Sequence, residues 1–362
     1  MKVSRTASLA AVVVVGALSL TACGSDNNGS TTTASTIDCA TGDLKGAGST
    51  FQKNIVSEWI KSYGDACSGA TLDYQGIGSG AGIKQLGEGT IDFAGSDSTM
   101  KPDEQSAADA TCGSPAVHLP VTAGGIAVAY NLPSVKDLQL SPNTLAGIFQ
   151  GTVKTWDDAA VKADNPGVTL PSTAITAVHR DDSSGTTKVF SSFLAATAAA
   201  DWKLGADKEL SWPAGVQGAK GSDGVSQAVA AAEGGITYVE KSYVDGSTAL
   251  AAAKVQNSAG EYAELDSGPV SEALAGATTD VTGQDIKVKI DFTAVKGDAY
   301  PITAVSYEIV CSKGKDAAKA KLLKSFLAYA VGDGQKSAED AGYAPLPDSL
   351  AGQVATAVTA LS

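Results

Sequence analysis

A single arginine lies four residues before a short turn of small residues, and the two together could bind an anion. Arg180 precedes Ser184, Gly185 and Thr186, after which apolar side chains recur at helical spacing. The first turn of a helix leaves backbone N–H groups without partners and carries the positive end of the helix dipole. A guanidinium adds paired donors that match two oxygens of an oxyanion. The pattern predicts a site for a small oxyanion.

Two similar turns occur earlier in the chain. Residues 46–51 read GAGSTF, and residues 76–82 read GIGSGAG. Each leads into helix-like sequence, so each offers a further set of first-turn amides. Three such helix starts could converge on one anion.

An acidic residue, Asp97, follows the apolar run 91–94. Its ordinary interpretation is a helix cap. If it instead faces the same cleft as Arg180, it can accept a hydrogen bond only from a ligand that still carries a proton, as phosphate does and sulfate does not. Sulfate would then meet a desolvated carboxylate at a cost of roughly several kcal/mol. Asp182 could orient the guanidinium, or it could be an acid of a surface turn.

Familiar catalytic motifs are absent from the sequence. Neither Ser79 nor Ser184 has glycine both two residues before and two residues after it, as a nucleophile elbow requires, and there is no P-loop motif. The glycine run 76–82 has Ala81 where a dinucleotide fingerprint needs glycine. An exported phosphatase would also need an activated nucleophile or a metal, for which we find no candidate. We therefore predict no catalytic residue and no enzyme.

The N-terminus reads as an export signal, residues 1–22. Lys2 and Arg5 precede an apolar run over 9–18 that is too short to span a bilayer. Leu-Thr-Ala then precedes Cys23, which resembles the lipobox of bacterial lipoproteins, so we expect Cys23 to be the lipidated residue. The alternative is an ordinary secretory peptide with a chance cysteine. Residues 23–43 are predicted to be the lipidated cysteine and a flexible linker.

Four cysteines remain in the body of the chain: Cys39, Cys67, Cys112 and Cys311. An even number in an exported protein favours two disulfides, although four cysteines allow three pairings. Among these we favour Cys39–Cys67 with Cys112–Cys311. With no Cys-x-x-Cys and only two histidines, the sequence indicates no metal site and no cofactor.

The chain is acidic. Its formal charge of −13 becomes −15 without the signal segment, which carries two basic residues and no acid. Such a surface repels nucleic acid and anionic lipid, and it repels a free oxyanion as well. Capture of an anion must therefore depend on short-range hydrogen bonds inside a dry cleft.

Strand-like and helix-like runs alternate, which predicts an α/β fold with ligand at the strand ends. The body of roughly 320 residues exceeds the usual size of a single core, so two lobes are expected. We predict strands at 44–47, 71–74, 91–94, 117–121, 125–130 and 303–311, and helices at 51–63, 83–86, 145–149, 317–329 and after the break at 344–347.

These motifs together resemble the phosphate-binding lipoproteins (PstS) of bacterial high-affinity phosphate ABC importers. The resemblance rests on residues 46–51, 74–80, 92–97, 154–158 (KTWDD), 180–186 and 346–349 (LPDS), and it runs in order from about residue 44 to the end. It implies a two-lobed periplasmic-binding-protein-like fold (type II) with a discontinuous lobe I of 44–129 plus 303–362 and a lobe II of 130–302. The crossings are expected near 129–131 and 302–306.

The resemblance also implies which residues hold phosphate. The ligand set is Ser49, Thr50, Phe51, Ser79, Asp97, Arg180, Ser184, Gly185 and Thr186. Backbone N–H groups of Thr50 and Phe51 would donate, the carboxylate of Asp97 would take the phosphate proton, and Asp182 would pair with Arg180.

A capture-and-delivery role follows from the same resemblance. The implied partners are inorganic phosphate and the permease subunits of the importer, with a lipid anchor on the extracytoplasmic face of the cell membrane, no nucleic acid and a monomeric state. Two other functions remain open besides the phosphatase: binding of another tetrahedral oxyanion, and an adhesin whose cleft is vestigial.

Overall fold

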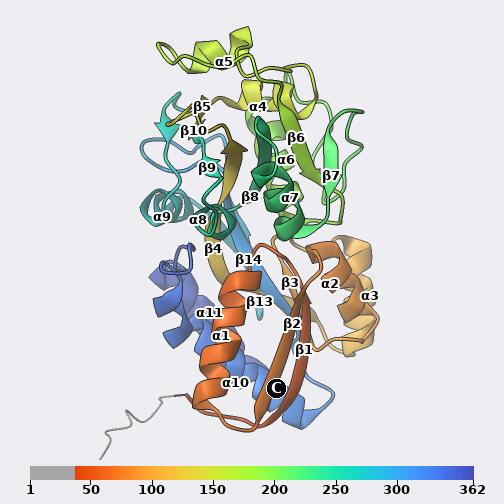
Figure 1. Cartoon of the computed structure of the whole chain (residues 1–362). Coiled ribbons are helices and arrows are strands. Elements are labelled where there is room, and N and C mark those ends of the chain that lie inside the picture. Colours follow the sequence, from red (N-terminus) through yellow and green to blue (C-terminus); the bar gives the residue numbers. More distant parts are fainter. Residues whose placement is uncertain (1–36) are drawn as a thin grey trace, which may run out of the picture. The chain divides into compact units, whose positions relative to one another are not determined.

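Three short strands near the start of the described chain run parallel and end at one edge of a sheet. The computed structural model describes residues 37–362 (Figure 1). In it, β1 (Gly42–Gly48) pairs with β2 (Ala70–Gly76) on one side and β3 (Phe93–Ser96) on the other. The turns that follow these strands therefore gather at the same edge, as expected for parallel strands joined through helices.

One twisted sheet connects the two lobes. Its strand order is β2-β1-β3-β14-β4-β8-β6-β7, and β9 also pairs with β4. The remaining strands of this sheet are β4 (Ala116–Asn131), β6 (Thr176–Arg180), β7 (Gln217–Ala219), β8 (Gly235–Glu240), β9 (Ala251–Ala252) and β14 (Thr303–Cys311). The other strands form two further sheets, one of β5 (Gln139–Leu140), β10 (Lys254–Gln256) and β11 (Tyr262–Ala263), and one of β12 (Thr278–Thr282) and β13 (Asp285–Lys289).

Helices cover the sheet in both lobes (Figure 1). In chain order they are α1 (Lys53–Ala66), α2 (Ser79–Gly87), α3 (Pro102–Cys112), α4 (Pro142–Phe149), α5 (Ala159–Asp164), α6 (Gly185–Thr197), α7 (Gly221–Ala230), α8 (Ser242–Asp245), α9 (Ser267–Ala275), α10 (Ala317–Val331) and α11 (Asp348–Ala360), with a 3₁₀ turn at Asp333–Ser337. Among the described residues, no helix is long and apolar enough to cross a membrane.

Strand β4 changes its pairing partner along its length. Residues 116–125 pair with β14, whereas Ile126 to Asn131 pair with β8. The change of partner comes a few residues before the predicted crossing at 129–131. The two strands predicted at 117–121 and 125–130 are in fact one continuous strand, and all sixteen of its residues are buried.

The prediction of two strands in place of β4 has a physical cause. Pro120, Gly124 and Gly125 are of residue types that usually end or interrupt a strand, so the sequence alone predicts a break there. In the fold Pro120 is accommodated beside a register shift between Ser306 and Tyr307 of β14. A side chain at Gly125 would lie 2.0 Å from Leu265, so the glycine reflects close packing rather than a turn.

Both bridges of the favoured cysteine pairing are present, Cys39–Cys67 and Cys112–Cys311. The Cys39–Cys67 bridge shows that the predicted flexible linker, 23–43, ends too late in the sequence. Ala40 is buried and β1 already begins at Gly42, so the described end of that segment belongs to the body. The export signal and Cys23 lie outside the described residues.

Candidate functional site

The candidate ligand residues gather at the carboxyl ends of strands from both lobes. The segment 49–51 follows β1, Ser79 follows β2 and Asp97 follows β3, while Arg180 ends β6 and Ser184 follows it. Eight of the nine predicted ligand residues are at most 4% exposed, and Gly185 is also buried. Since most polar residues lie at a protein surface, joint burial of this set indicates a built polar site.

Asp97 lies at the centre of the site and does not cap a helix. Its Oδ1 accepts hydrogen bonds from Ser49 Oγ at 2.5 Å and from Ser306 Oγ at 2.7 Å. Its Oδ2 has longer contacts, 3.5 Å from Ser79 Oγ and 3.4 Å from Thr186 Oγ1. Oδ2 is therefore the oxygen with accepting capacity left for another donor.

The electrostatic surroundings of Asp97 are those of a buried acid near a cation. Burial raises the pKa of Asp97, and the hydrogen bonds from Ser49 and Ser306 together with the charge of Arg180 oppose that rise. A carboxylate in this position is a strong acceptor for a ligand proton, because little water competes with the ligand.

Arg180 is held by a carboxylate two residues away. Its Nε and Nη2 donate to Asp182 Oδ1 and Oδ2, at 2.6 and 2.5 Å. Burial raises the pKa of Asp182, but the hydrogen bonds and charge of Arg180 outweigh it and leave that pKa below its usual value. The bidentate pair orients the guanidinium and leaves other N–H groups free to point elsewhere. Asp182 is thus half-buried in the cleft, not an acid of a surface turn.

Ser184 begins the helix that the sequence predicted. Its side chain is the N-cap of α6 and accepts from the backbone N–H of Thr187 at 3.1 Å. Gly185 and Thr186 are the first two helical residues, so their amides belong to the first turn. The Gly185 amide donates to Ser79 Oγ at 3.1 Å, which joins the starts of α6 and α2.

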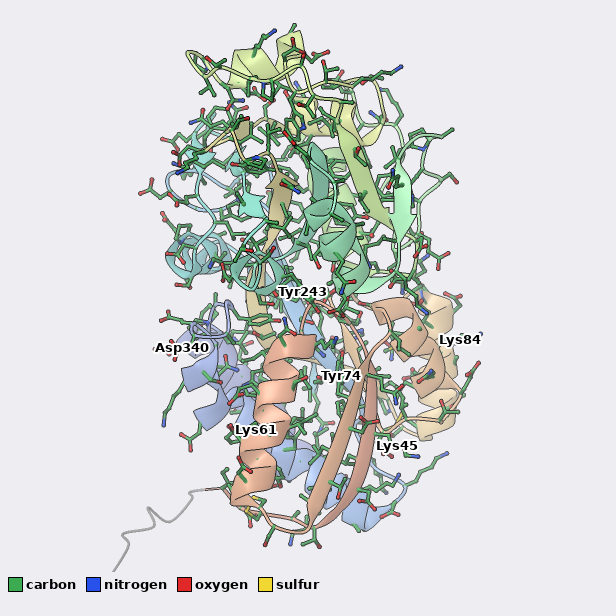
Figure 2. The ribbon with its side chains drawn as sticks, in the orientation of Figure 1. Lys45, Lys61, Tyr74, Lys84, Tyr243 and Asp340 are labelled. Carbon is green, nitrogen blue, oxygen red and sulfur yellow. A yellow bond between two sulfur atoms is a disulfide. The ribbon has the colours of Figure 1, made fainter. Side chains whose placement is uncertain are left out.

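The turn before α1 is joined to the second lobe. The hydroxyls of Thr50 and Ser222 lie 2.8 Å apart, and the Thr50 carbonyl accepts from Tyr243 at 3.0 Å. Figure 2 shows Tyr243 where the two halves of the view meet. Within the turn, the Phe51 amide donates to Ser49 Oγ at 3.0 Å, so that amide and the Ser49 hydroxyl already have partners.

The two lobes are closed onto each other around this site. The Gly80 amide donates to the Ser183 carbonyl at 2.9 Å. Ion pairs add to the closure at the periphery: Lys53–Asp223 at 2.8 Å, Lys101–Asp207 at 2.8 Å and Lys208–Glu104 at 2.5 Å. A side chain at Gly185 would lie 2.6 Å from Ser79 Oγ and 2.7 Å from Asp97 Oδ2, so only glycine permits this approach.

Sequence reasoning missed several residues of the site. Ser222 lies in the first turn of α7, and the small-residue pair with Gly221 was a signal of the same kind as the three turns that were recognised. Ser306 and Gln52 had no such signal. Ser306 is one hydroxyl in a buried strand, and its contact with Asp97 joins residues 209 positions apart.

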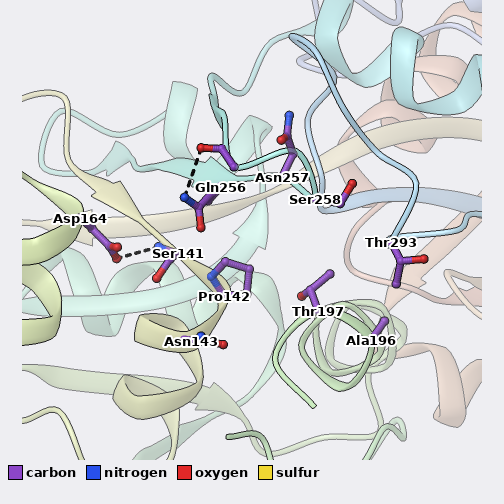
Figure 3. A pocket seen from close by; sticks show the side chains of 11 residues that line it. Ser141, Pro142, Asn143, Asp164, Ala196, Thr197, Gln256, Asn257, Ser258 and Thr293 are labelled. Atoms are coloured by element: carbon purple, nitrogen blue, oxygen red, sulfur yellow. Dashed lines mark hydrogen bonds between the residues drawn. The ribbon is translucent and has the colours of Figure 1, made fainter. Parts of the chain in front are cut away.

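A hollow away from the anion site differs from that site in chemistry. It measures about 530 Å³ and is lined mainly by uncharged polar residues from the start of α4, the end of α6 and β10 (Figure 3). Its one charged side chain is Asp164, which accepts from the Ser141 amide. With an acid and no cation, this hollow is unsuited to an oxyanion. Within residues 37–362 no cluster of acids, histidines or cysteines could hold a metal ion.

Comparisons with known proteins give the same fold. A family model described as a PBP superfamily domain matches residues 29–333. The phosphate-binding protein PstS 3 of Mycobacterium tuberculosis (strain ATCC 25618 / H37Rv) is 39% identical, with all of both chains covered. The phosphate-binding protein PstS of Xylella fastidiosa (strain 9a5c) is 35% identical over 91% of this chain and 88% of its own.

A solved structure supports the architecture. The high-affinity periplasmic phosphate-binding protein PfluDING, bound with phosphate, superposes with a TM-score of 0.72 at 23% identity. The superposition covers 87% of this chain and 93% of that one.

Proposed function

Because the chain belongs to the PBP superfamily and, within it, to the PstS phosphate-binding proteins, we propose that it captures inorganic phosphate between its lobes and delivers it to an ABC permease. The observation that carries the proposal is the convergence on Asp97 of buried hydroxyl donors from distant segments, with the charge of Arg180 close to it. The family consists of binding proteins, so this chain is a carrier and not an enzyme.

Recognition depends on matching donors and acceptors to one protonated anion. Amides and hydroxyls from the turn 49–51 before α1, from Ser79 at the start of α2 and from 184–186 at the start of α6 surround the ligand, and Arg180 supplies the positive charge. Asp97 Oδ2 accepts the proton of the phosphate. Sulfate has no proton to give at neutral pH, so it would face the carboxylate directly. These roles are carried by short-range hydrogen bonds, as the acidic surface of the protein requires.

Closure of the lobes converts binding into a signal. Donors from both lobes meet only when the cleft is shut, and the peripheral ion pairs form in the same state. A permease can therefore distinguish the loaded carrier by its shape. We place the protein outside the cytoplasmic membrane, as a monomer held by a lipid on Cys23.

The lobe boundaries are part of this proposal. We assign 44–129 with 303–362 to lobe I and 130–302 to lobe II. The change of partner along β4 between Gly125 and Ile126 supports a discontinuous first lobe and favours a boundary slightly earlier than 129.

Equilibrium titration tests the function. Calorimetry with inorganic phosphate, arsenate, sulfate and molybdate should give one site that binds phosphate and rejects sulfate. Tight sulfate binding would remove the role of Asp97 and favour a carrier of another oxyanion. An absence of binding by all four anions would favour a vestigial cleft. Turnover of an aryl phosphate that is lost in Ser184→Ala would restore the phosphatase alternative.

A further inference from the structure

A further acid, Glu308, lies buried on β14 close to Asp97. It is 1% exposed, and its Oε1 accepts a hydrogen bond from Gln52 Nε2 at 2.7 Å. Its Oε2 is buried and has no hydrogen-bond partner among the described residues. Within the same part of the chain, no Lys, Arg or His forms an ion pair with it. A buried carboxyl without a cation requires an explanation.

Gln52 connects this acid with the centre of the anion site. Besides the bond to Glu308, its Nε2 donates to Tyr74 Oη at 3.2 Å, while its Oε1 accepts from Ser306 Oγ at 2.8 Å. Ser306 Oγ also lies 2.7 Å from Asp97 Oδ1, so its one hydroxyl proton is shared between Gln52 Oε1 and Asp97 Oδ1. Because the amide nitrogen must face the acceptor on Glu308, the amide oxygen must face Ser306. The orientation of Gln52 therefore depends on Glu308.

The charges nearby favour the neutral form of Glu308. Burial raises the pKa of Glu308 well above its usual value, and the neighbouring charge of Asp97 raises it further, while the bond from Gln52 opposes both. Tyr74 and Asp97 are the titratable groups that face it, and both are acids. An ionised Glu308 would add another negative charge beside Asp97 and its anionic ligand.

We propose that Glu308 is a positioning residue of the phosphate site: its acceptor fixes the amide of Gln52, and through the Ser306 hydroxyl, which contacts both Gln52 and Asp97, it holds Asp97 so that Oδ2 faces the ligand proton. The inference rests on the proposed function and extends it. Glu308 does not touch the ligand. Its contribution is to keep the Ser306 hydroxyl in place beside Oδ1 of Asp97, so that discrimination between phosphate and sulfate is preserved.

Three variants separate this role from general packing. Glu308→Gln keeps an acceptor for Gln52 and cannot ionise, so it should bind phosphate within about twofold of the wild type. Glu308→Leu has similar volume but no acceptor, so it should bind phosphate ~tenfold more weakly, the effect of one lost hydrogen bond. Gln52→Leu removes the amide that contacts both Glu308 and Ser306, so it should show a similar loss of phosphate affinity. The double variant with Leu at both positions should lose no more than either single variant.

The experiment is calorimetric titration of the purified full chain with inorganic phosphate and with sulfate, with thermal denaturation to confirm folding. Weaker phosphate binding and reduced selectivity in Glu308→Leu and Gln52→Leu, with recovery in Glu308→Gln, support the inference. Wild-type affinity and selectivity in both Leu variants overturn it, and so does a tenfold loss in Glu308→Gln. If Glu308→Leu does not fold, Gln52→Leu decides alone. A wild-type protein that binds no phosphate overturns the proposed function itself.

Discussion

Replacing Asp97 by asparagine should reduce discrimination between phosphate and sulfate while the fold is retained. In the structure Oδ1 already accepts two short hydrogen bonds, from Ser49 and Ser306, and an amide oxygen can accept both. The amide nitrogen would then occupy the place of Oδ2, near Ser79 and Thr186. That position would donate where it previously accepted.

The magnitude follows from the bond that is lost. A hydrogen bond to a charged group contributes about 1.5–3 kcal/mol, so phosphate affinity should fall by roughly ten- to a hundredfold. Sulfate would gain a donor and lose a repulsive carboxylate, so its affinity should hold or rise. The ratio of the two dissociation constants should therefore shrink by at least about tenfold.

Calorimetric titration of both anions measures this ratio for Asp97→Asn. Asp103→Asn is the matched control, because Asp103 is an exposed acid in the first turn of α3. The control should bind both anions as the wild type does. An equal loss of affinity for phosphate and sulfate in Asp97→Asn would refute the assignment of Asp97 as the acceptor of the ligand proton.

Three further changes have expected outcomes. Gly185→Ala adds a methyl 2.6 Å from the nearest side-chain oxygen, so phosphate affinity should fall at least ~100-fold in a titration. Gly352→Ala is the control, because an added methyl there meets nothing within 4 Å, and it should bind phosphate normally. Equal phosphate affinities of the Gly185→Ala and Gly352→Ala variants would contradict the close approach of Gly185 to Ser79 and Asp97. Replacing both Cys112 and Cys311 by alanine opens a 199-residue loop and should lower the free energy of unfolding in urea by ~5 kcal/mol without changing affinity. Unchanged stability would count against that bridge. Burial raises the pKa of Glu240 to about 8 from 4.5, so the folded protein keeps a proton that the unfolded chain releases. Stability should therefore fall as pH rises between these values, and Glu240→Gln should flatten that profile in thermal denaturation; parallel profiles would disprove it.

The local signals of the sequence predicted much of the site. Turns of small residues before apolar helices marked the starts of α2 and α6, and the structure brings both against Asp97. These signals work because a helix start and its cap are determined within a few residues. The ligand roles of the nine residues stay a prediction until a ligand is bound.

The tertiary features could not be predicted in the same way. β4 reads as two strands because proline and glycine break the local pattern, yet its neighbours β14 and β8 keep the strand continuous. The contacts of Gln52 with Ser306 and Glu308 join residues more than 250 positions apart. No periodicity or spacing in one sequence records such contacts, because they depend on which faces the folded sheet brings together.

A crystal structure of the protein grown with inorganic phosphate tests the central claim most directly. We expect one phosphate between the lobes, within hydrogen-bond distance of Asp97 Oδ2, the Arg180 guanidinium and the first-turn amides of α6. A phosphate bound elsewhere, with Asp97 and Arg180 turned away from it, would contradict the account.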